Sequence, residues 1–371
     1  MRPMTQESNY KPQREALDKV YQWCVLLKIE IIKDRFLYLY CLLTTSAIYA
    51  LTLYYSFPFQ YSVNTYFHTL YLATYSAFLI WCTYYYLYLL YKKEKRPTKR
   101  FLLKLKSILL PLHQTVAVIL LFLTLGVVFA NYTFLKFIIP VINPYEFDHA
   151  LAELDRVLHL GLDPWLITHY VFSSPWASLL LNTAYNLWFF IMWGVLFFFL
   201  IYKRKPVLRF QFLITFLLTW MLLGSVTATL FSSVGPCYLE LLTGDQKFTP
   251  LMDTLNAQSQ YLEGYGGLSL WALNTQNYLW QAYENQQNGL GAGISALPSM
   301  HVSIAILVAL SLYRLNKTAG YLGYAFAALI QIGSVHLAWH YAVDGYVSII
   351  LTVLLWKLVG RFIARFPQWF N

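Results

Sequence analysis

Long apolar stretches that carry almost no charge recur along this chain, and they constrain its fold more than any other feature. A helix that spans a bilayer needs roughly 20 such residues. Composition points the same way, since 58% of the residues are hydrophobic and 12% are charged, which is about half the charged share of a soluble domain. The chain is therefore predicted to be a polytopic integral membrane protein. About eight spans are expected, over residues 36–57, 65–91, 112–135, 178–202, 210–232, 299–314, 318–339 and 342–362.

Each span is predicted to be helical, which makes the fold all-α. Lipid offers no hydrogen-bond partner to the backbone, and a barrel would show short segments of alternating hydrophobicity instead. About 35 polar residues precede the first span, so that span is expected to act as its own insertion signal rather than as a cleaved signal peptide.

Basic residues give the expected orientation. All but three of the 27 Lys and Arg residues fall in segments that one side of the membrane would share, namely 1–35, 92–106, 203–209, 314–317 and 357–365. The positive-inside rule places these segments and both termini in the cytoplasm. The net charge of +10 then follows from topology and anionic lipid at the membrane, and no nucleic-acid partner is expected. The three remaining cations are Lys136, Arg156 and Lys247.

Two long segments are expected on the outer side, over residues 136–177 and 233–298. The first has apolar residues at helical spacing from His149 onward. The second is rich in Gln, Asn, Tyr and Gly, which suits either hydroxyl-rich head groups or a solvated, irregular lid. Lys136 lies near a run of Ile and Pro and is expected to extend to the membrane interface.

Histidines near the end of the chain are the candidate catalytic residues. His301 opens one span and His340 lies between the next two, so the chain returns both to the outer face. Asp344 lies four residues after His340, so the two side chains would be within hydrogen-bonding reach on a helix. If Asp344 accepts a hydrogen bond from one ring N–H of His340, the other ring nitrogen is free to act as a nucleophile or base. Ser299 and His301 lie at a helix start, where backbone N–H groups favour an anion. These are the parts of a phosphoryl-transfer centre.

Other interpretations of these residues stay open. His336, His340 and Asp344 would share one helical face at i, i+4 and i+8, which could hold a metal ion, although no Cys or Glu lies nearby. A histidine at the outer face can also be an ordinary interface residue. A transporter or channel is a further class, but its broken midplane helices and paired charges are not evident.

Two motifs carry a resemblance to a known family. Pro298-Ser299-Met300-His301 and His340-x-x-x-Asp344 resemble the second and third signature motifs of the phosphatidic-acid phosphatase type 2 superfamily. Within it, the chain looks most like the inositol phosphorylceramide synthase branch, and the resemblance spans roughly 140–360. Four segments suggest that branch: Leu154–His159, Gly161–Trp165, Tyr185–Trp188 and Ser233–Tyr238.

The resemblance implies a six-helix catalytic core and a mechanism that needs neither metal nor cofactor. His340 would attack phosphorus and form a phosphohistidine, Asp344 would orient it, and His301 would protonate the departing alkoxide. The implied organisation is a cytoplasmic segment over 1–35, two extra spans and a basic loop over 36–110, and the catalytic domain over 111–371.

This chain departs from the family's motifs where they bind phosphate. The first motif is missing, because Arg-Pro occurs only in segments expected in the cytoplasm, and Ser334 stands where the third motif has Arg. Met300 replaces a glycine of the second motif. Other residues are therefore expected to bind substrate. Arg156 ranks first for its bidentate fork and Lys247 second, although Arg156 could simply pair with Asp155 or Asp163. The further candidates are Ser299, His336 and Tyr238.

The expected function is a lipid phosphoryl transferase or phosphatase at the outer membrane face. Its substrate would be a lipid phosphate or a phospholipid, and it could pass a head group such as phosphoinositol to a lipid alcohol. The alternatives are a phosphatase that releases inorganic phosphate and a non-catalytic lipid-binding relative. The sequence does not indicate the oligomeric state.

Overall fold

The computed structural model describes residues 10–56, 63–287 and 291–370, and this part of the chain contains helices and no strand. The described residues fall into two compact units. One contains residues up to Ser46 together with Phe67–Val128, and the other contains Ala47–Tyr66 and Phe129–Asn371. The predicted all-α fold is confirmed.

The first unit holds amino-terminal helices. They are α1 (Tyr10–Lys33), most of α2 (Arg35–Tyr55), most of α3 (Val63–Tyr91), α4 (Pro97–Leu109) and the start of α5 (Leu112–Ile142). A Cβ atom on Gly126 of α5 would lie 2.5 Å from the ring of Phe67, so α3 and α5 approach closely there. The basic loop expected over 92–106 continues into α4, in which no residue is buried.

Six helices in the described ranges are long and apolar enough to cross a bilayer, which supports an integral membrane protein. They are α2, α5, α8 (Pro175–Ile201), the continuous segment Pro206–Leu230, α15 (Lys317–His336) and α16 (Ala342–Arg365). Pro206–Leu230 comprises α9 (Pro206–Leu218), the π-helical η1 (Thr219–Thr227) and α10 (Ala228–Leu230).

The expected count of eight spans is not reached. Helix α3 occupies one of the expected spans and has 29 residues. It is rich in tyrosine and is not among the six. Helix α14 (Met300–Leu315) is apolar but has 16 residues, and at 1.5 Å per residue it extends over about 24 Å, less than the roughly 30 Å hydrocarbon core.

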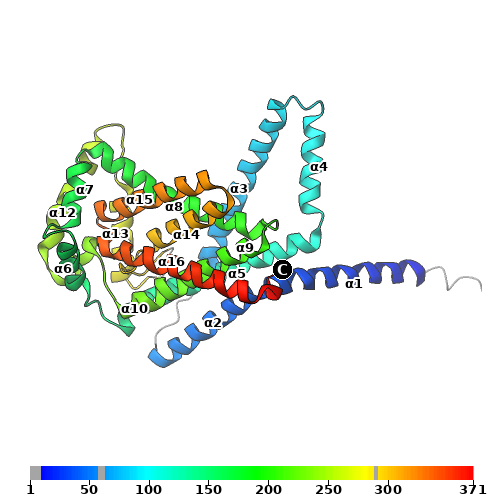
Figure 1. Ribbon diagram of the computed structural model, residues 1–371, viewed down its shortest axis with the longest axis horizontal. Coiled ribbons are helices and arrows are strands. Elements are labelled where there is room, and N and C mark those ends of the chain that lie inside the picture. Colours follow the sequence, from blue (N-terminus) through cyan, green and yellow to red (C-terminus); the bar gives the residue numbers. More distant parts are fainter. Residues whose placement is uncertain (1–9, 57–62, 288–290, 371) are drawn as a thin grey trace, which may run out of the picture. The chain divides into compact units, whose positions relative to one another are not determined.

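Helices α14, α15 and α16 form the centre of the second unit (Figure 1). Helix α14 packs against both α15 and α16, α15 also packs on α8, and α16 packs on α9. Glycines permit the close contact, since a Cβ atom on Gly323 of α15 would lie 2.9 Å from the Cα atom of Ala309 in α14. Asn316 joins these helices and its side chain accepts a hydrogen bond from the Ala319 N–H. The start of α14 and the end of α15 therefore return to the same end of the bundle.

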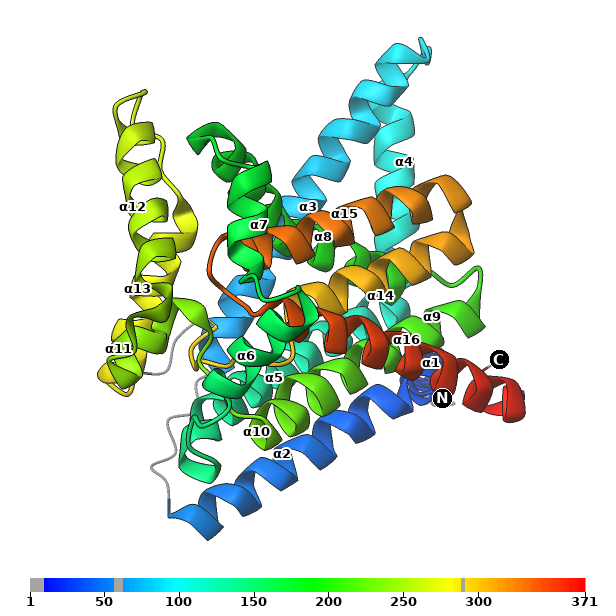
Figure 2. The same cartoon turned by 60° about the vertical axis from the view of Figure 1, so that its left-hand side comes forward.

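Short helices gather at that end (Figure 2). They are α6 (Asp148–Leu158), α7 (Pro164–Val171), η2 (Pro236–Tyr238), α11 (Leu239–Thr243), η3 (Gln246–Phe248), α12 (Thr249–Glu263) and α13 (Trp271–Glu284). The chain closes with η4 (Pro367–Trp369). An irregular lid over 233–298 is therefore the wrong description, because much of that segment is helical. Its amides serve packing: Gln276 donates to the Leu337 carbonyl and Gln258 accepts from the Ser178 hydroxyl.

Candidate active site

His340 and Asp344 are in contact at the start of α16. Nδ1 of His340 lies 3.3 Å from Oδ2 of Asp344. His340 itself precedes the helix: α16 begins at Ala342, and Tyr341 is the N-cap residue of α16. The contact therefore depends on the loop that leads into α16 and not on one continuous helical face. Since Nδ1 faces the carboxylate, Nε2 is the ring nitrogen left for a reacting group.

Asp344 is held in a fully buried position. Its Oδ2 also accepts a hydrogen bond from the Tyr341 N–H at 3.0 Å, as an acidic residue in the first turn of a helix often does. Its other oxygen, Oδ1, is buried and has no hydrogen-bond partner within the part of the chain that the structure describes. Gly345 lies beside it, and a Cβ atom there would displace the end of the Gln331 side chain.

Two aspartates of α6 hold the backbone around this pair. Asp155 accepts hydrogen bonds from the N–H groups of Ala342 and Val343, at 2.7 and 2.8 Å. Asp148 accepts from the N–H groups of Val234 and Gly235 and from the Tyr341 hydroxyl. These roles were not predicted from the sequence. The i, i+7 spacing of the two aspartates indicates that both lie on one face of a short helix. It does not indicate which residues they bind, because those partners lie far away in sequence.

Burial and hydrogen bonding act in opposite directions on these two carboxyl groups. Burial raises the pKa of both Asp148 and Asp155, because removal from water disfavours the charged form. Hydrogen bonds from backbone N–H groups favour the carboxylate and limit the rise. Each group is a structural anchor whose two oxygens are occupied by donors from the protein.

Gly235 is the glycine that the loop before η2 requires. Its φ of +86° favours glycine, and a Cβ atom there would lie 2.7 Å from the Trp339 carbonyl oxygen. The close approach lets the Cys237 N–H donate to the carbonyl of Ala338. This hydrogen bond holds the loop before η2 against the residues that directly precede His340.

His301 lies in the first turn of α14 among aromatic rings. Its ring stacks on Tyr185 with centroids 4.4 Å apart and lies 4.2 Å from the Trp188 ring. The Trp188 indole N–H donates to the His301 carbonyl at 2.8 Å. The Tyr185 ring also stacks on Trp339, the residue before His340, and the Ser299 N–H donates to the Asp344 carbonyl, so the fold brings together the segments of the two histidines that the sequence separates by a pair of helices.

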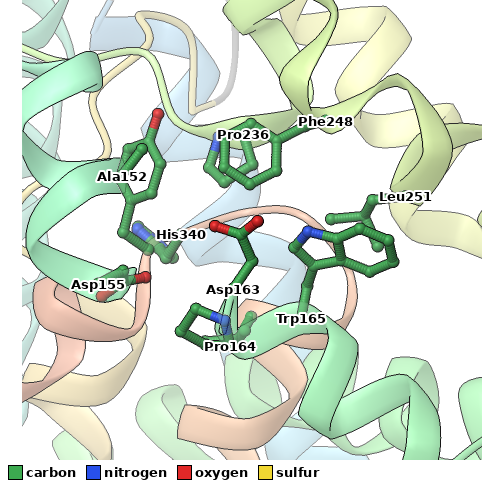
Figure 3. Close-up of a pocket in the computed structure, with 11 residues that line it drawn as sticks. Ala152, Asp155, Asp163, Pro164, Trp165, Pro236, Phe248, Leu251 and His340 are labelled. Carbon is green, nitrogen blue, oxygen red and sulfur yellow. The ribbon is translucent and has the colours of Figure 1, made fainter. Parts of the chain in front are cut away.

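A pocket opens beside His340 (Figure 3). The Asp163 carboxylate lies in its centre, between His340 and Trp165. Asp155, Tyr341 and several apolar side chains complete the wall: Ala152, Pro164, Pro236, Phe248, Leu251 and Val335. This lining combines two carboxyl groups and one imidazole with apolar and aromatic surface.

Arg156 and Lys247 both lie near Asp163 but are not part of the pocket wall. Arg156 Nε is 3.9 Å from Asp163 Oδ1, and its Nη1 is 3.9 Å from Glu153 Oε2. Lys247 Nζ is 3.6 Å from the same Asp163 oxygen. The pairing of Arg156 with Asp163 was the alternative that the sequence left open. Asp155 is not its partner, because the Asp155 oxygens accept from the start of α16.

Ser299 and Tyr238 make packing contacts. Ser299 is fully buried, its hydroxyl accepts from the Val302 N–H at the start of α14, and its carbonyl accepts from the Ser348 hydroxyl. Tyr238 is buried and donates its hydroxyl to the Gln276 carbonyl. Both side chains are already engaged within the protein.

His336 lies away from the pocket wall. It is fully buried at the end of α15, its Nε2 is 2.7 Å from the Ser178 hydroxyl, and its ring stacks on His169 at 3.8 Å. Burial lowers the pKa of His169. The single helical face needed for a metal site of His336, His340 and Asp344 does not exist, because α15 ends at His336 and α16 begins at Ala342.

Comparison with known families decides the classification. The model of the PAP2 superfamily matches residues 149–358, which is more than half of the chain. The chain belongs to the PAP2 superfamily. Neither a curated protein nor a solved structure matches it.

Membership in the PAP2 superfamily indicates a lipid phosphatase or phosphotransferase type of function in a membrane setting. The matched range begins in α6 and ends in α16, so it contains Asp155 as well as His301, His340 and Asp344.

Proposed function

We propose that this protein is a membrane-embedded lipid phosphoryl transferase that works through a phosphohistidine. The observation that supports this most is the His340–Asp344 contact beside a pocket, with His301 stacked on Tyr185, whose ring also stacks on Trp339 next to His340. An oriented imidazole, a carboxylate behind it and a second imidazole provide a nucleophile, its positioning group and an acid. A purely structural role would not require a histidine at the wall of a pocket.

In the first step, Nε2 of His340 attacks phosphorus while the bond to the leaving oxygen breaks. Asp344 holds Nδ1–H, which keeps the electron pair on Nε2 and stabilises the positive charge that develops on the ring. His301 gives its proton to the departing alkoxide. The products are a phosphohistidine and an alcohol.

In the second step, a hydroxyl oxygen attacks the phosphohistidine, its proton passes to His301, and the P–N bond breaks. We propose an alcohol acceptor, as in the inositol phosphorylceramide synthase branch that the chain resembles. The pocket supports this choice, since the Asp163 carboxylate can accept a hydrogen bond from the hydroxyl group of an acceptor alcohol while Trp165 and Phe248 offer apolar surface to its hydrocarbon. Water as the acceptor would give a phosphatase.

The experiment that tests the function uses the purified protein and a panel of lipid phosphates and phospholipids. Inorganic phosphate and head-group exchange onto a lipid alcohol are measured in parallel. We expect exchange to exceed phosphate release, because an alcohol bound against Asp163 and Trp165 competes well with water. Phosphate release alone would identify a phosphatase. The absence of both reactions across the panel would favour a non-catalytic lipid-binding relative.

We also propose that both termini lie in the cytoplasm and that His340 faces the outer side, on the strength of the basic segments. Single cysteines at Lys95 and Gln260, both exposed, test this in a background where the exposed Cys24 is serine. We expect a membrane-impermeant thiol reagent to label position 260 in intact cells and position 95 only after permeabilisation. Labelling of position 95 in intact cells would reverse the orientation.

A further inference from the structure

The Trp165 indole carries a hydrogen-bond donor that the protein leaves unused. Its Nε1 atom is buried and has no hydrogen-bond partner within the part of the chain that the structure describes. A buried N–H group is costly to leave without an acceptor. Trp165 also lines the pocket beside His340. We therefore expect the acceptor to belong to a molecule that the pocket binds.

Asp163 faces this donor. Figure 3 shows the Trp165 indole with its nitrogen on the edge that is nearer to the Asp163 carboxylate, yet no hydrogen bond joins the two side chains. Asp163 is the N-cap residue of α7, but its side chain accepts no capping hydrogen bond. It is 22% exposed, so a ligand can reach its oxygens. The pocket thus presents a donor and an acceptor that face each other.

Few chemical groups can bind to this pair. A phosphate or carboxylate oxygen would accept from the indole, but the negative charge of Asp163 would repel it. An ammonium group would donate to Asp163, but it has no lone pair for the indole N–H. A hydroxyl group does both, since its oxygen accepts while its hydrogen is donated. The pocket has space for a group about the size of a water molecule.

The place of Asp163 within the pocket decides which hydroxyl group this is. Asp163 lies between Trp165 and His340 (Figure 3), so a hydroxyl group held by the indole and the carboxylate lies on the side away from the His340 ring. The hydroxyl group that attacks phosphorus must be at His340. One alcohol that occupies both places therefore carries at least two hydroxyl groups. Phe248 and Leu251 line the same pocket and suit the hydrocarbon of a lipid.

We propose that Trp165 and Asp163 bind a second hydroxyl group of the acceptor and so select a lipid diol over a lipid alcohol with one hydroxyl group. This inference rests on the proposed function and names the class of acceptor. The indole N–H donates to the oxygen of this hydroxyl group, which donates its own hydrogen to Asp163. No covalent bond of this group forms or breaks. It orients the acceptor so that the neighbouring hydroxyl group attacks the phosphohistidine.

The test compares two acceptors, hexadecanol and a hexadecanediol with hydroxyl groups on its first two carbon atoms. The purified full-length protein in detergent receives each acceptor together with a phospholipid donor from the panel above, and kcat/KM is measured for both. Trp165→Phe keeps an aromatic ring and removes the N–H group, and Asp163→Asn removes the negative charge. The matched controls are Trp271→Phe and Asp253→Asn, which change exposed residues that are not part of the pocket wall.

We expect the wild type to favour the diol by about 10- to 100-fold in kcat/KM, the size expected for a hydrogen bond to a charged group. Trp165→Phe and Asp163→Asn should each lower this preference by about 3- to 10-fold and change kcat/KM for hexadecanol far less. Both residues act on one hydroxyl group, so the double variant should lose less than the two single losses combined. The controls should keep the wild-type preference. A structural role would lower kcat/KM for both acceptors equally.

Thermal unfolding in the same detergent measures binding without turnover, because a ligand that binds the folded state raises the unfolding temperature. Hexadecanediol should raise it more than hexadecanol in the wild type, and this difference should shrink in Trp165→Phe. Free inositol is the third probe. If inositol stabilised the protein through Trp165 while the two lipid alcohols had equal effects, the bound hydroxyl group would belong to the transferred head group, and the proposal would be overturned.

Equal kcat/KM for the two alcohols in the wild type would also overturn the proposal, as would a preference for the diol that survives unchanged in both Trp165→Phe and Asp163→Asn. Stabilisation by hexadecanediol that depends on Trp165, in a protein that turns over no lipid, would keep this inference and defeat the proposed function. Turnover at equal rates with both alcohols, without any extra stabilisation by the diol, would do the reverse.

Discussion

Replacement of His340 by alanine should abolish turnover, with kcat lowered by at least ~10³-fold, as for other deletions of a catalytic nucleophile. The physical reason is that Nε2 of His340 forms the covalent bond to phosphorus and no other side chain of the pocket wall is a strong nucleophile. The measurement is single-turnover kinetics with a radiolabelled lipid phosphate. Wild type should accumulate a phosphoprotein that is stable to alkali and labile to acid, as expected of a P–N bond.

The matched control is His149→Ala. This variant removes a histidine of α6 that pairs with Asp245 and is not part of the pocket wall. It should retain wild-type turnover and phosphoenzyme. Residual activity of His340→Ala above a hundredth of wild type would contradict the proposed nucleophile. So would a phosphoprotein of wild-type yield in that variant, since the label would then reside on another residue.

Asp344→Asn should lower kcat by about 10³- to 10⁴-fold, comparable to the loss when other His–Asp pairs lose the carboxylate. Oδ2 of Asp344 accepts from the Tyr341 N–H and also faces Nδ1 of His340, so the oxygen or the N–H₂ group of asparagine, but not both, can take this place. With the oxygen there, the start of α16 keeps its geometry, but the negative charge that stabilises the positive ring is lost. With the N–H₂ group there, Nδ1 becomes an acceptor and the proton moves to Nε2, where it blocks attack on phosphorus.

The measurement for Asp344→Asn combines kcat, phosphoenzyme yield and thermal unfolding. A positioning role predicts a large fall in the first two with a small change in unfolding temperature. A mainly structural role would show the opposite pattern, a lower unfolding temperature with kcat per folded molecule within tenfold of wild type. Asp344→Glu is the conservative comparison and should recover part of the rate, because it keeps a carboxylate acceptor.

The membrane class and the helical fold followed from the sequence because they depend on local composition. Apolar stretches of bilayer length must pair their backbone groups internally, whatever their neighbours are. The pairing of His340 with Asp344 also depends on short spacing, so it was foreseeable, as was the return of His301 to the same end. The count of eight spans is not confirmed, since α3 and α14 are not among the six helices that are long and apolar enough to cross a bilayer.

Tertiary structure alone decided what each polar side chain contacts. Asp148 and Asp155 anchor loops that lie about 90 to 190 residues away in sequence, and no local pattern could name those partners. The same holds for His336, which faces Ser178 of α8 and not the pocket wall.

For the cations, the sequence supplied their number and their side of the membrane. Whether each has a counter-ion depends on which carboxylate the packed helices bring within a few ångströms, since charge interactions weaken with distance and with exposure to water. Packing placed Asp163 beside Arg156 and Lys247.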